Sequence, residues 1–137
     1  MSREINSRLV NKGNRFSASP VDNQVNLPVI FSLQYIQSGK FCFSLLEHKQ
    51  KGDFADALYR RKDFTWHDLH QNDHRKLGVE QLPVELMKER RPEFLTEDVE
   101  KYDVIRFSHN NRRIVGFRKN HVFYILWIDC GFKRYSH

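Results

Sequence analysis

The C-terminal third of the chain constrains the fold most strongly, because it reads as three consecutive strands of one antiparallel sheet. Runs rich in β-branched and aromatic residues cover residues 104–107, 112–118 and 122–129. Two short polar breaks, at residues 108–111 and 120–121, separate these runs. This pattern is typical of successive hairpins. The sequence therefore predicts a three-stranded meander that carries several arginines.

Closing both turns tightly gives this meander a register. Phe107 is then expected to face Arg112, and Lys119 is expected to face Val122. Directly opposed residues share one face of a sheet. The same register puts Trp127 on the face that carries Arg112.

Two pairs of charged side chains follow from this register. Arg106 is expected beside Arg113, and these like charges repel unless they face water or an anion. Arg112 is expected to face Asp129 as a cross-strand ion pair.

Length, charge and cysteine usage narrow the class of protein. The 137 residues suit one domain, and a net charge of +6 favours polyanionic partners such as nucleic acid, a ribosome or an acidic protein. Two cysteines, Cys42 and Cys130, form neither a disulfide framework nor a paired metal motif. No apolar run suits a signal peptide or a membrane span. We therefore expect a cytoplasmic protein that does not enter a membrane.

The N-terminal part divides into a tail and the start of the domain. Residues 1–26 are polar and basic with scattered apolar side chains, so we predict a flexible tail there and a single domain over residues 27–137. Residues 28–36 and 41–45 each alternate apolar and polar side chains, and turn residues lie between them. This pattern predicts an N-terminal hairpin.

Helices are expected in the middle of the chain. Phe54, Ala57 and Leu58 follow Asp53 at helical spacing, which predicts a short helix from Asp53. A second helix is expected after Thr65 and before Gly78, and its start resembles a capping box. A third helical turn is predicted over residues 82–88, where a proline stands at the start. Residues 96–100 are expected to form an acidic connector to the terminal sheet.

These elements together predict an α+β fold. We expect a mainly antiparallel sheet, made of the N-terminal hairpin and the C-terminal meander, with two or three short helices on one face.

The densest group of basic and aromatic residues lies in the terminal segment. Sheet-borne arginines can hold phosphates through two hydrogen bonds, and exposed aromatic rings can stack on bases. The alternative is that these charges only keep a sheet edge soluble. The group comprises Arg106, His109, Arg112, Arg113, Arg118, Lys119, His121, Lys133, Arg134, Tyr135 and His137.

Three histidines of the second predicted helix suggest a different chemistry. His67, His70 and His74 lie at spacings that put them on one helix stripe, where imidazoles could bind a metal ion. The pattern lacks the H-E-x-x-H motif, and a hydrated helix face would look the same. We therefore expect no metal and no other cofactor. The sequence also lacks a Gly-rich phosphate loop and a G-x-S-x-G motif.

Four parts of the terminal segment carry a family resemblance: the run from Arg113 to Arg118, the break before Val122, the run to Asp129 and the closing residues 133–135. They resemble the C-terminal half of the RelE/HigB/ParE superfamily of bacterial toxins. The resemblance implies a basic protein with an antiparallel sheet and helices on one face. Its RelE-like branch cuts messenger RNA on the ribosome, its ParE-like branch inhibits DNA gyrase, and an antitoxin neutralises either kind.

The resemblance implies metal-independent cleavage, in which the RNA 2′-hydroxyl attacks the adjacent phosphate. Arg106 and Arg113 suit a phosphate clamp that Arg118 extends, and Tyr135 or His137 suits proton transfer. The nucleic-acid contacts are expected from Arg112, Lys119, His121, Lys133 and Arg134.

The leading hypothesis is a toxin-like ribonuclease with RNA or a ribosome and an antitoxin as partners. The alternative is a non-catalytic module that binds nucleic acid or a protein through the same arginine-rich sheet. A third reading is a metal-dependent nuclease that uses the three histidines.

Overall fold

The computed structural model describes residues 26–38, 43–73, 76–107 and 112–129, and it has the predicted α+β architecture. Two helices and five strands occur in these ranges, together with 3-10 turns at Phe43–Leu45 and Val84–Leu86. The tail was predicted over residues 1–26, and all of these residues except the last lie outside the described residues. The elements are β1 (Ile30–Ser32), α1 (His48–Tyr59), α2 (Trp66–Gln71), β2 (Val79–Pro83), β3 (Lys101–Phe107), β4 (Arg112–Lys119) and β5 (Val122–Asp129).

All five strands belong to one mixed sheet, in the order β1-β5-β4-β3-β2. The strands β2 to β5 pair antiparallel in chain order, as the predicted meander requires for β3 to β5. The strand β1 instead pairs parallel with β5, at the other end of the sequence. The sheet is therefore mixed, and its layout differs from the one predicted.

The predicted N-terminal hairpin is wrong. Its first half contributes only β1, and the described part of its second half, Phe43–Leu45, is a 3-10 turn. The ring of Phe31 lies 5.7 Å from that of Phe123 on β5, and the ring of Phe43 lies 5.7 Å from that of Phe54 on α1. The aromatic side chains that suggested two paired strands thus pack against different elements.

A strand that the sequence did not predict, β2, forms the far edge of the sheet. Val79 packs on the helix-covered face, whereas Leu82 packs on the opposite face. With one buried apolar residue on each face, Val79 and Leu82, this strand shows no alternation of apolar and polar residues, so its periodicity gave no signal. Pro83 ends this edge strand, where a residue without an N–H group does not interrupt the hydrogen bonds between strands. Of the helical turn predicted over residues 82–88, only Val84–Leu86 is helical, as a 3-10 turn.

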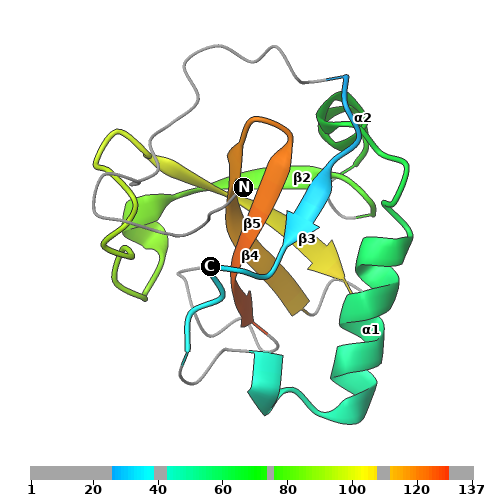
Figure 1. Cartoon of the computed structure of the whole chain (residues 1–137), viewed down its shortest axis with the longest axis horizontal. Coiled ribbons are helices and arrows are strands. Elements are labelled where there is room, and N and C mark those ends of the chain that lie inside the picture. The colour runs from blue at the N-terminus through cyan, green and yellow to red at the C-terminus, as the bar shows by residue number, and fades with distance from the viewer. Residues whose placement is uncertain (1–25, 39–42, 74–75, 108–111, 130–137) are drawn as a thin grey trace, which may run out of the picture.

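The two helices cover one face of the sheet, as predicted (Figure 1). The capping box of α2 is present, because Thr65 Oγ1 accepts from the Asp68 N–H at 3.1 Å and Asp68 accepts from the Thr65 N–H at 2.9 Å. Helix α1 starts five residues earlier than predicted. Glu47 precedes it, and the Glu47 N–H donates to Gln50 at 2.8 Å.

Within the described residues, neither helix combines the length and the apolar character that a membrane-crossing helix needs.

The meander has the predicted register at both turns, since Phe107 pairs with Arg112 and Lys119 pairs with Val122. Arg106 lies directly opposite Arg113, also as predicted.

A β-bulge changes the register between β4 and β5. Val115 pairs with Trp127 but Gly116 pairs with Ile125, which leaves Leu126 as an extra residue. Leu126 and Trp127 therefore pack on the same face, opposite the helices, whereas the predicted register put Trp127 on the face that carries Arg112.

The bulge also makes the predicted pairing of Arg112 with Asp129 wrong. Asp129 lies opposite Arg113 instead. Arg112 approaches a carboxylate of α1, with its Nη1 3.9 Å from Asp53 Oδ2.

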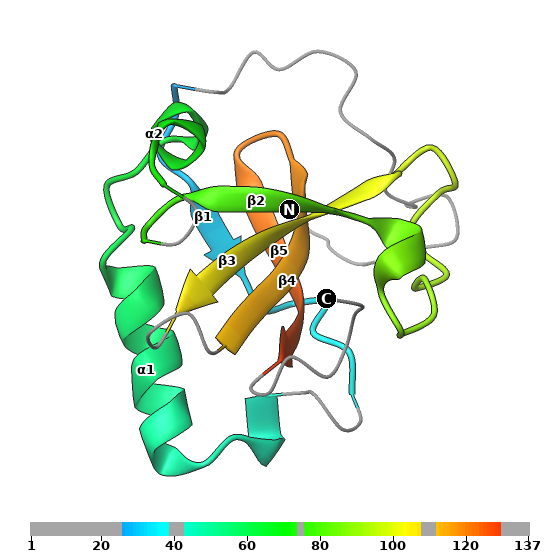
Figure 2. The ribbon, with the colours of Figure 1, turned by 180° about the vertical axis from the view of Figure 1, so that it is seen from behind.

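Both faces of the sheet carry a core. One core joins α1 and α2 to the sheet through Phe54, Ala57, Trp66 and Leu69. The other lies under the segment between β2 and β3, which runs along the opposite side of the sheet in Figures 1 and 2. Its members include Met87, Leu95, Val99, Tyr102, Phe117, Leu126 and Trp127.

Gly116 is required by close packing at the bulge. A Cβ at this position would lie 2.1 Å from the Tyr124 carbonyl oxygen and 2.3 Å from a Phe123 ring carbon. We expect Gly116→Ala to lower the free energy of unfolding by about 2–3 kcal/mol, because the buried backbone must shift. Urea unfolding at pH 7 measures this change.

A matched glycine lies on α1. A Cβ at Gly52 meets nothing within 4 Å, so Gly52→Ala should raise the free energy of unfolding by about 0.5–1 kcal/mol through helix propensity. If Gly116→Ala left the free energy of unfolding unchanged or raised it, the close packing at Gly116 would be disproved.

Candidate functional site

A row of four charged side chains crosses the face of the sheet opposite the helices. It runs from Glu80 on β2 through Arg106 on β3 and Arg113 on β4 to Asp129 on β5. The direct pairings of Arg106 with Arg113 and of Arg113 with Asp129 set its order, and an ion pair joins Arg106 to Glu80. We call these four residues the charged row.

The outer half of the charged row reaches solvent. Arg106 Nε lies 2.6 Å from Glu80 Oε1, and the two side chains are 22% and 29% exposed. Their geometry is that of a charge-assisted hydrogen bond. This pair is therefore the part of the row that a ligand from solution can reach.

The inner half of the charged row is buried. Arg113 is 3% exposed and Asp129 is completely buried. Directly opposed residues on neighbouring strands have Cβ atoms about 5 Å apart. Arg113 Nη1 also donates to the Arg112 carbonyl oxygen at 3.3 Å. We conclude that Asp129 supplies a negative charge close to a buried guanidinium.

The flanking carboxylates explain how two arginines can lie side by side. Arg106 and Arg113 repel each other, and a buried cation without a counter-charge is costly. Glu80 and Asp129 provide one negative charge next to each arginine. An arriving phosphate would offer the same compensation, with oxygen atoms suited to the guanidinium fork. Arg106, in the accessible half of the row, can therefore exchange its carboxylate contact for a phosphate contact.

Glu80 was not among the residues that the sequence singled out. It became part of the site because β2, a strand that the sequence did not predict, pairs with β3. A carboxylate within hydrogen-bonding distance of an arginine can accept a proton from a nearby hydroxyl group.

The remaining predicted arginines lie elsewhere. Arg118 is on the helix-covered face of β4, five residues beyond Arg113, which corresponds to roughly 17 Å along a strand. Its guanidinium carbon lies 4.7 Å from the Trp66 ring centroid, and its Nε donates to the Asn120 carbonyl oxygen at 2.5 Å. Arg112 faces α1 from the start of the same strand.

The other predicted contacts divide into two groups. Lys119 and His121 flank the turn between β4 and β5, where Asn120 adopts a positive φ of 58°. They lie at the opposite end of β4 from Arg112, so they do not form one site with it. His109 and the residues Lys133, Arg134, Tyr135 and His137 lie outside the described residues.

The two described histidines of the candidate metal site, His67 and His70, are exposed on α2, and His74 lies outside the described residues. The His70 ring lies 6.0 Å from the Trp66 ring. In the described ranges, no three His, Cys, Asp or Glu side chains come close enough together to hold a metal ion.

A buried carboxylate on the helix-covered face was also missed by the sequence. Asp103 is 8% exposed and pairs across the sheet with Gln81 and Gly116. Burial raises its pKa to about 7, although a hydrogen bond from Gln81 and the positive charge of Arg118 act in the opposite direction. The sequence around Asp103 does not indicate a buried carboxylate, because its burial depends on the pairing of β3 with both β2 and β4.

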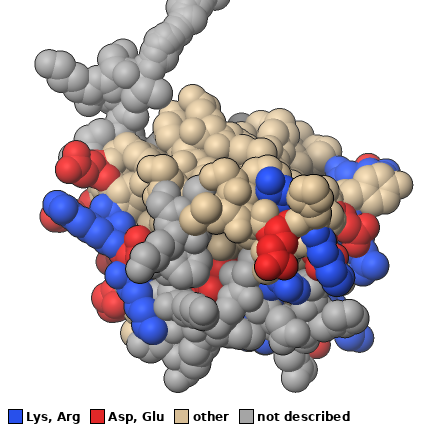
Figure 3. All heavy atoms as spheres, turned by 90° about the horizontal axis from the view of Figure 1, so that it is seen from below, with Lys and Arg blue, Asp and Glu red and all other residues tan. Residues whose placement is uncertain are grey.

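The described surface mixes charges of both signs on one side of the molecule. Figure 3 shows Lys and Arg interspersed with Asp and Glu on the face that it presents. Opposite charges also pair directly within the described residues, as Arg60 does with Asp56 at 2.9 Å and Lys62 with Asp63 at 2.8 Å. The described part of that face therefore offers no continuous basic field.

Comparisons of the chain with protein-family models, with curated proteins and with solved structures found no match.

Proposed function

We propose that this protein is a toxin-like ribonuclease that cleaves RNA without a metal ion, with Arg106 as the side chain that binds the scissile phosphate. The observation that carries the proposal is the pair of directly opposed arginines, Arg106 and Arg113, in the charged row. Arg106 is accessible, and Arg113 adds a second positive charge behind it. Two cations near one point favour a group that gains negative charge in the transition state.

The reaction follows from these groups. The 2′-hydroxyl oxygen bonds to the adjacent phosphorus and loses its proton to a base, and the bond from phosphorus to the 5′-oxygen breaks. The leaving 5′-oxygen takes up a proton, so the products carry a 2′,3′-cyclic phosphate and a 5′-hydroxyl group. Glu80 is the carboxylate next to Arg106 and suits the base. Tyr135 or His137 is our candidate for the acid.

The resemblance to the RelE-like toxins remains part of the proposal. The features that the chain shares with this picture are helices on one face of the sheet and a final run of three antiparallel strands. On this basis we propose messenger RNA on the ribosome as the substrate and an antitoxin protein as the partner.

The first test uses purified protein and RNA in the presence of EDTA. We expect cleavage to continue and the new ends to be 5′-hydroxyl groups that polynucleotide kinase labels directly. Arg106→Ala should reduce the cleavage rate about a hundredfold, because one positioned donor to the developing charge is lost. Arg106→Lys should restore only part of the rate, because lysine keeps the charge without the fork.

The control is Arg60→Ala, which removes an arginine that is 64% exposed and that, among the described residues, pairs only with Asp56 at the surface of α1. It should leave cleavage unchanged. Inducible expression in bacteria extends the test: wild type should arrest growth and create new transcript ends, whereas Arg113→Ala and Tyr135→Ala should not. Folded, soluble protein that neither arrests growth nor cleaves RNA would refute the proposal.

The second candidate is a non-catalytic module that binds nucleic acid or an acidic protein. The burial of Arg113 and Asp129 favours it, because two buried, directly opposed charges can stabilise the pairing of β4 with β5 without binding any ligand. RNA binding that weakens steeply with salt, with no cleavage under any condition, would establish this reading.

A further inference from the structure

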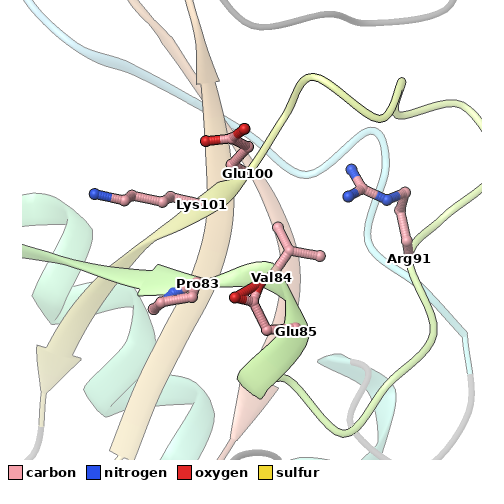
Figure 4. Close-up of a pocket in the computed structure, with 6 residues that line it drawn as sticks. All are labelled: Pro83, Val84, Glu85, Arg91, Glu100 and Lys101. Carbon is pink, nitrogen blue, oxygen red and sulfur yellow. The ribbon is translucent and has the colours of Figure 1, made fainter.

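A pocket at the end of β2 lies apart from the accessible part of the charged row. It occupies about 490 Å³, which falls within the range of small-molecule sites. The Val84 N–H donates to the Glu100 carbonyl oxygen at 2.9 Å and so holds the 3-10 turn against the start of β3. The lining residues are Pro83, Val84, Glu85, Arg91, Glu100 and Lys101 (Figure 4).

The charged side chains of this pocket do not neutralise one another. Glu85, Glu100, Arg91 and Lys101 make no ion pair within 4.0 Å with any residue that the structure describes. The lining thus combines two carboxylates with two cations at separate positions. A simple anion would meet the two carboxylates, and a simple cation would meet Arg91 and Lys101.

Arg91 is held in place by only one of its three nitrogens. Its Nη1 donates to the carbonyl oxygens of Thr96 at 2.8 Å and Val99 at 2.7 Å. Among the described residues, no acceptor binds its Nε or Nη2. Figure 4 shows Arg91 on a separate loop, across from Val84 and Glu100. A guanidinium fixed in this way loses little entropy when a ligand carboxylate binds.

A buried hydroxyl group near Arg91 also lacks a partner. Tyr102 is completely buried, and its Oη has no hydrogen-bond partner among the described residues. Burial raises its pKa to about 12, and the charge of Arg91 acts to lower it, so the two groups lie near each other. A carboxylate bound at Arg91 would bring a hydrogen-bond acceptor into this neighbourhood.

We infer that this pocket binds a small zwitterion with one carboxylate and one ammonium group. The carboxylate binds Arg91, the ammonium group lies near Glu85 and Glu100, and the aliphatic part packs on Pro83 and Val84. A free α-amino acid and a dipeptide share this chemistry. The inference does not depend on ribonuclease activity, because none of the four residues of the charged row lines the pocket.

Binding is measured with the full chain by thermal unfolding and by calorimetric titration. The probes are glycine, L-leucine, L-lysine, L-glutamate and glycylglycine, with glycinamide and acetate as ligands of a single charge. We expect a zwitterion at 10 mM to raise Tm by a few degrees, and the single-charge ligands to leave it unchanged. Comparing the affinity for the single amino acids with the affinity for glycylglycine shows whether the pocket prefers a free amino acid or a dipeptide.

Two pairs of variants identify the pocket as the binding site. Glu85→Gln should weaken zwitterion binding at least tenfold, whereas Glu93→Gln, at an exposed residue outside the pocket, should not. Arg91→Gln should abolish binding, and Arg90→Gln should not. The inference is overturned if no zwitterion binds, if glycinamide or acetate binds equally well, or if Glu85→Gln has no effect on binding.

Discussion

Replacing Asp103 with asparagine is expected to stabilise the protein at pH 8, by about 4 kcal/mol at most. Burial raises the pKa of Asp103 from 3.8 to about 7, and each pH unit corresponds to about 1.36 kcal/mol. The folded state therefore binds the proton more tightly than the unfolded state does. As the pH rises from about 4 to 7, the wild type loses stability, and the loss is complete above pH 7. Asparagine is neutral at every pH, so the variant does not incur this loss.

Urea unfolding of both proteins between pH 4 and pH 8.5 provides the measurement. The two curves should differ least near pH 4, where the carboxyl group is protonated in the folded state and partly ionised in the unfolded state, and they should separate as the pH rises. Asp63→Asn is the control, because the Asp63 side chain is 85% exposed and, in the part of the chain that the structure describes, binds only Lys62. If Asp103→Asn destabilised the protein at pH 8, the attraction between Asp103 and Arg118 would exceed the cost of burial.

The second large effect is expected at Arg61, a buried cation bound by carbonyl oxygens. Its guanidinium donates to the carbonyl oxygens of Ala57 at 2.7 Å, Leu77 at 3.0 Å, Lys76 at 3.2 Å and Arg106 at 3.3 Å. Arg61 is 1% exposed, and burial lowers its pKa to about 10. Arg61→Met should reduce the free energy of unfolding by about 4 kcal/mol or more, because it leaves several carbonyl groups without their donor.

The neighbouring Arg60 provides a matched control. Its side chain is 64% exposed and forms one ion pair with Asp56, so Arg60→Met should cost less than about 1 kcal/mol. Arg61→Lys should fall between the two, because an ammonium group is compact and cannot span four carbonyl groups as the fork does. Equal, small effects of Arg60→Met and Arg61→Met would show that the hydrogen bonds of Arg61 contribute little.

Elements specified by neighbouring residues could be predicted from the sequence. The capping box that defines the start of α2 is a signal only four residues long, from Thr65 to Asp68. The turns after Phe107 and Lys119 define the register at each end of β4. These signals are local, and the structure has them where they were expected.

Elements specified by distant residues could not be predicted. The strand β1 was assigned to a hairpin because its alternation says nothing about which strand it joins. Because of the bulge at Leu126, Asp129 lies opposite Arg113 rather than opposite Arg112 as predicted, and no residue type in β5 indicates that a bulge occurs there. Within the candidate site, the sequence predicted that Arg106 and Arg113 are neighbours. It missed Glu80 and Asp129 as their flanking partners, because each depends on a strand pairing or a bulge.

The parallel pairing of β1 with β5 also sets an order of events during folding. Ile30 is the first residue of β1, and its partner Val122 is the first residue of β5, the last strand in the sequence. Bringing the two together requires closure of a loop that contains the rest of the domain, which costs more entropy than closing the short turns of β3 to β5. During synthesis, β1 leaves the ribosome long before its partner exists. The first strand in the sequence is therefore the last to join the sheet.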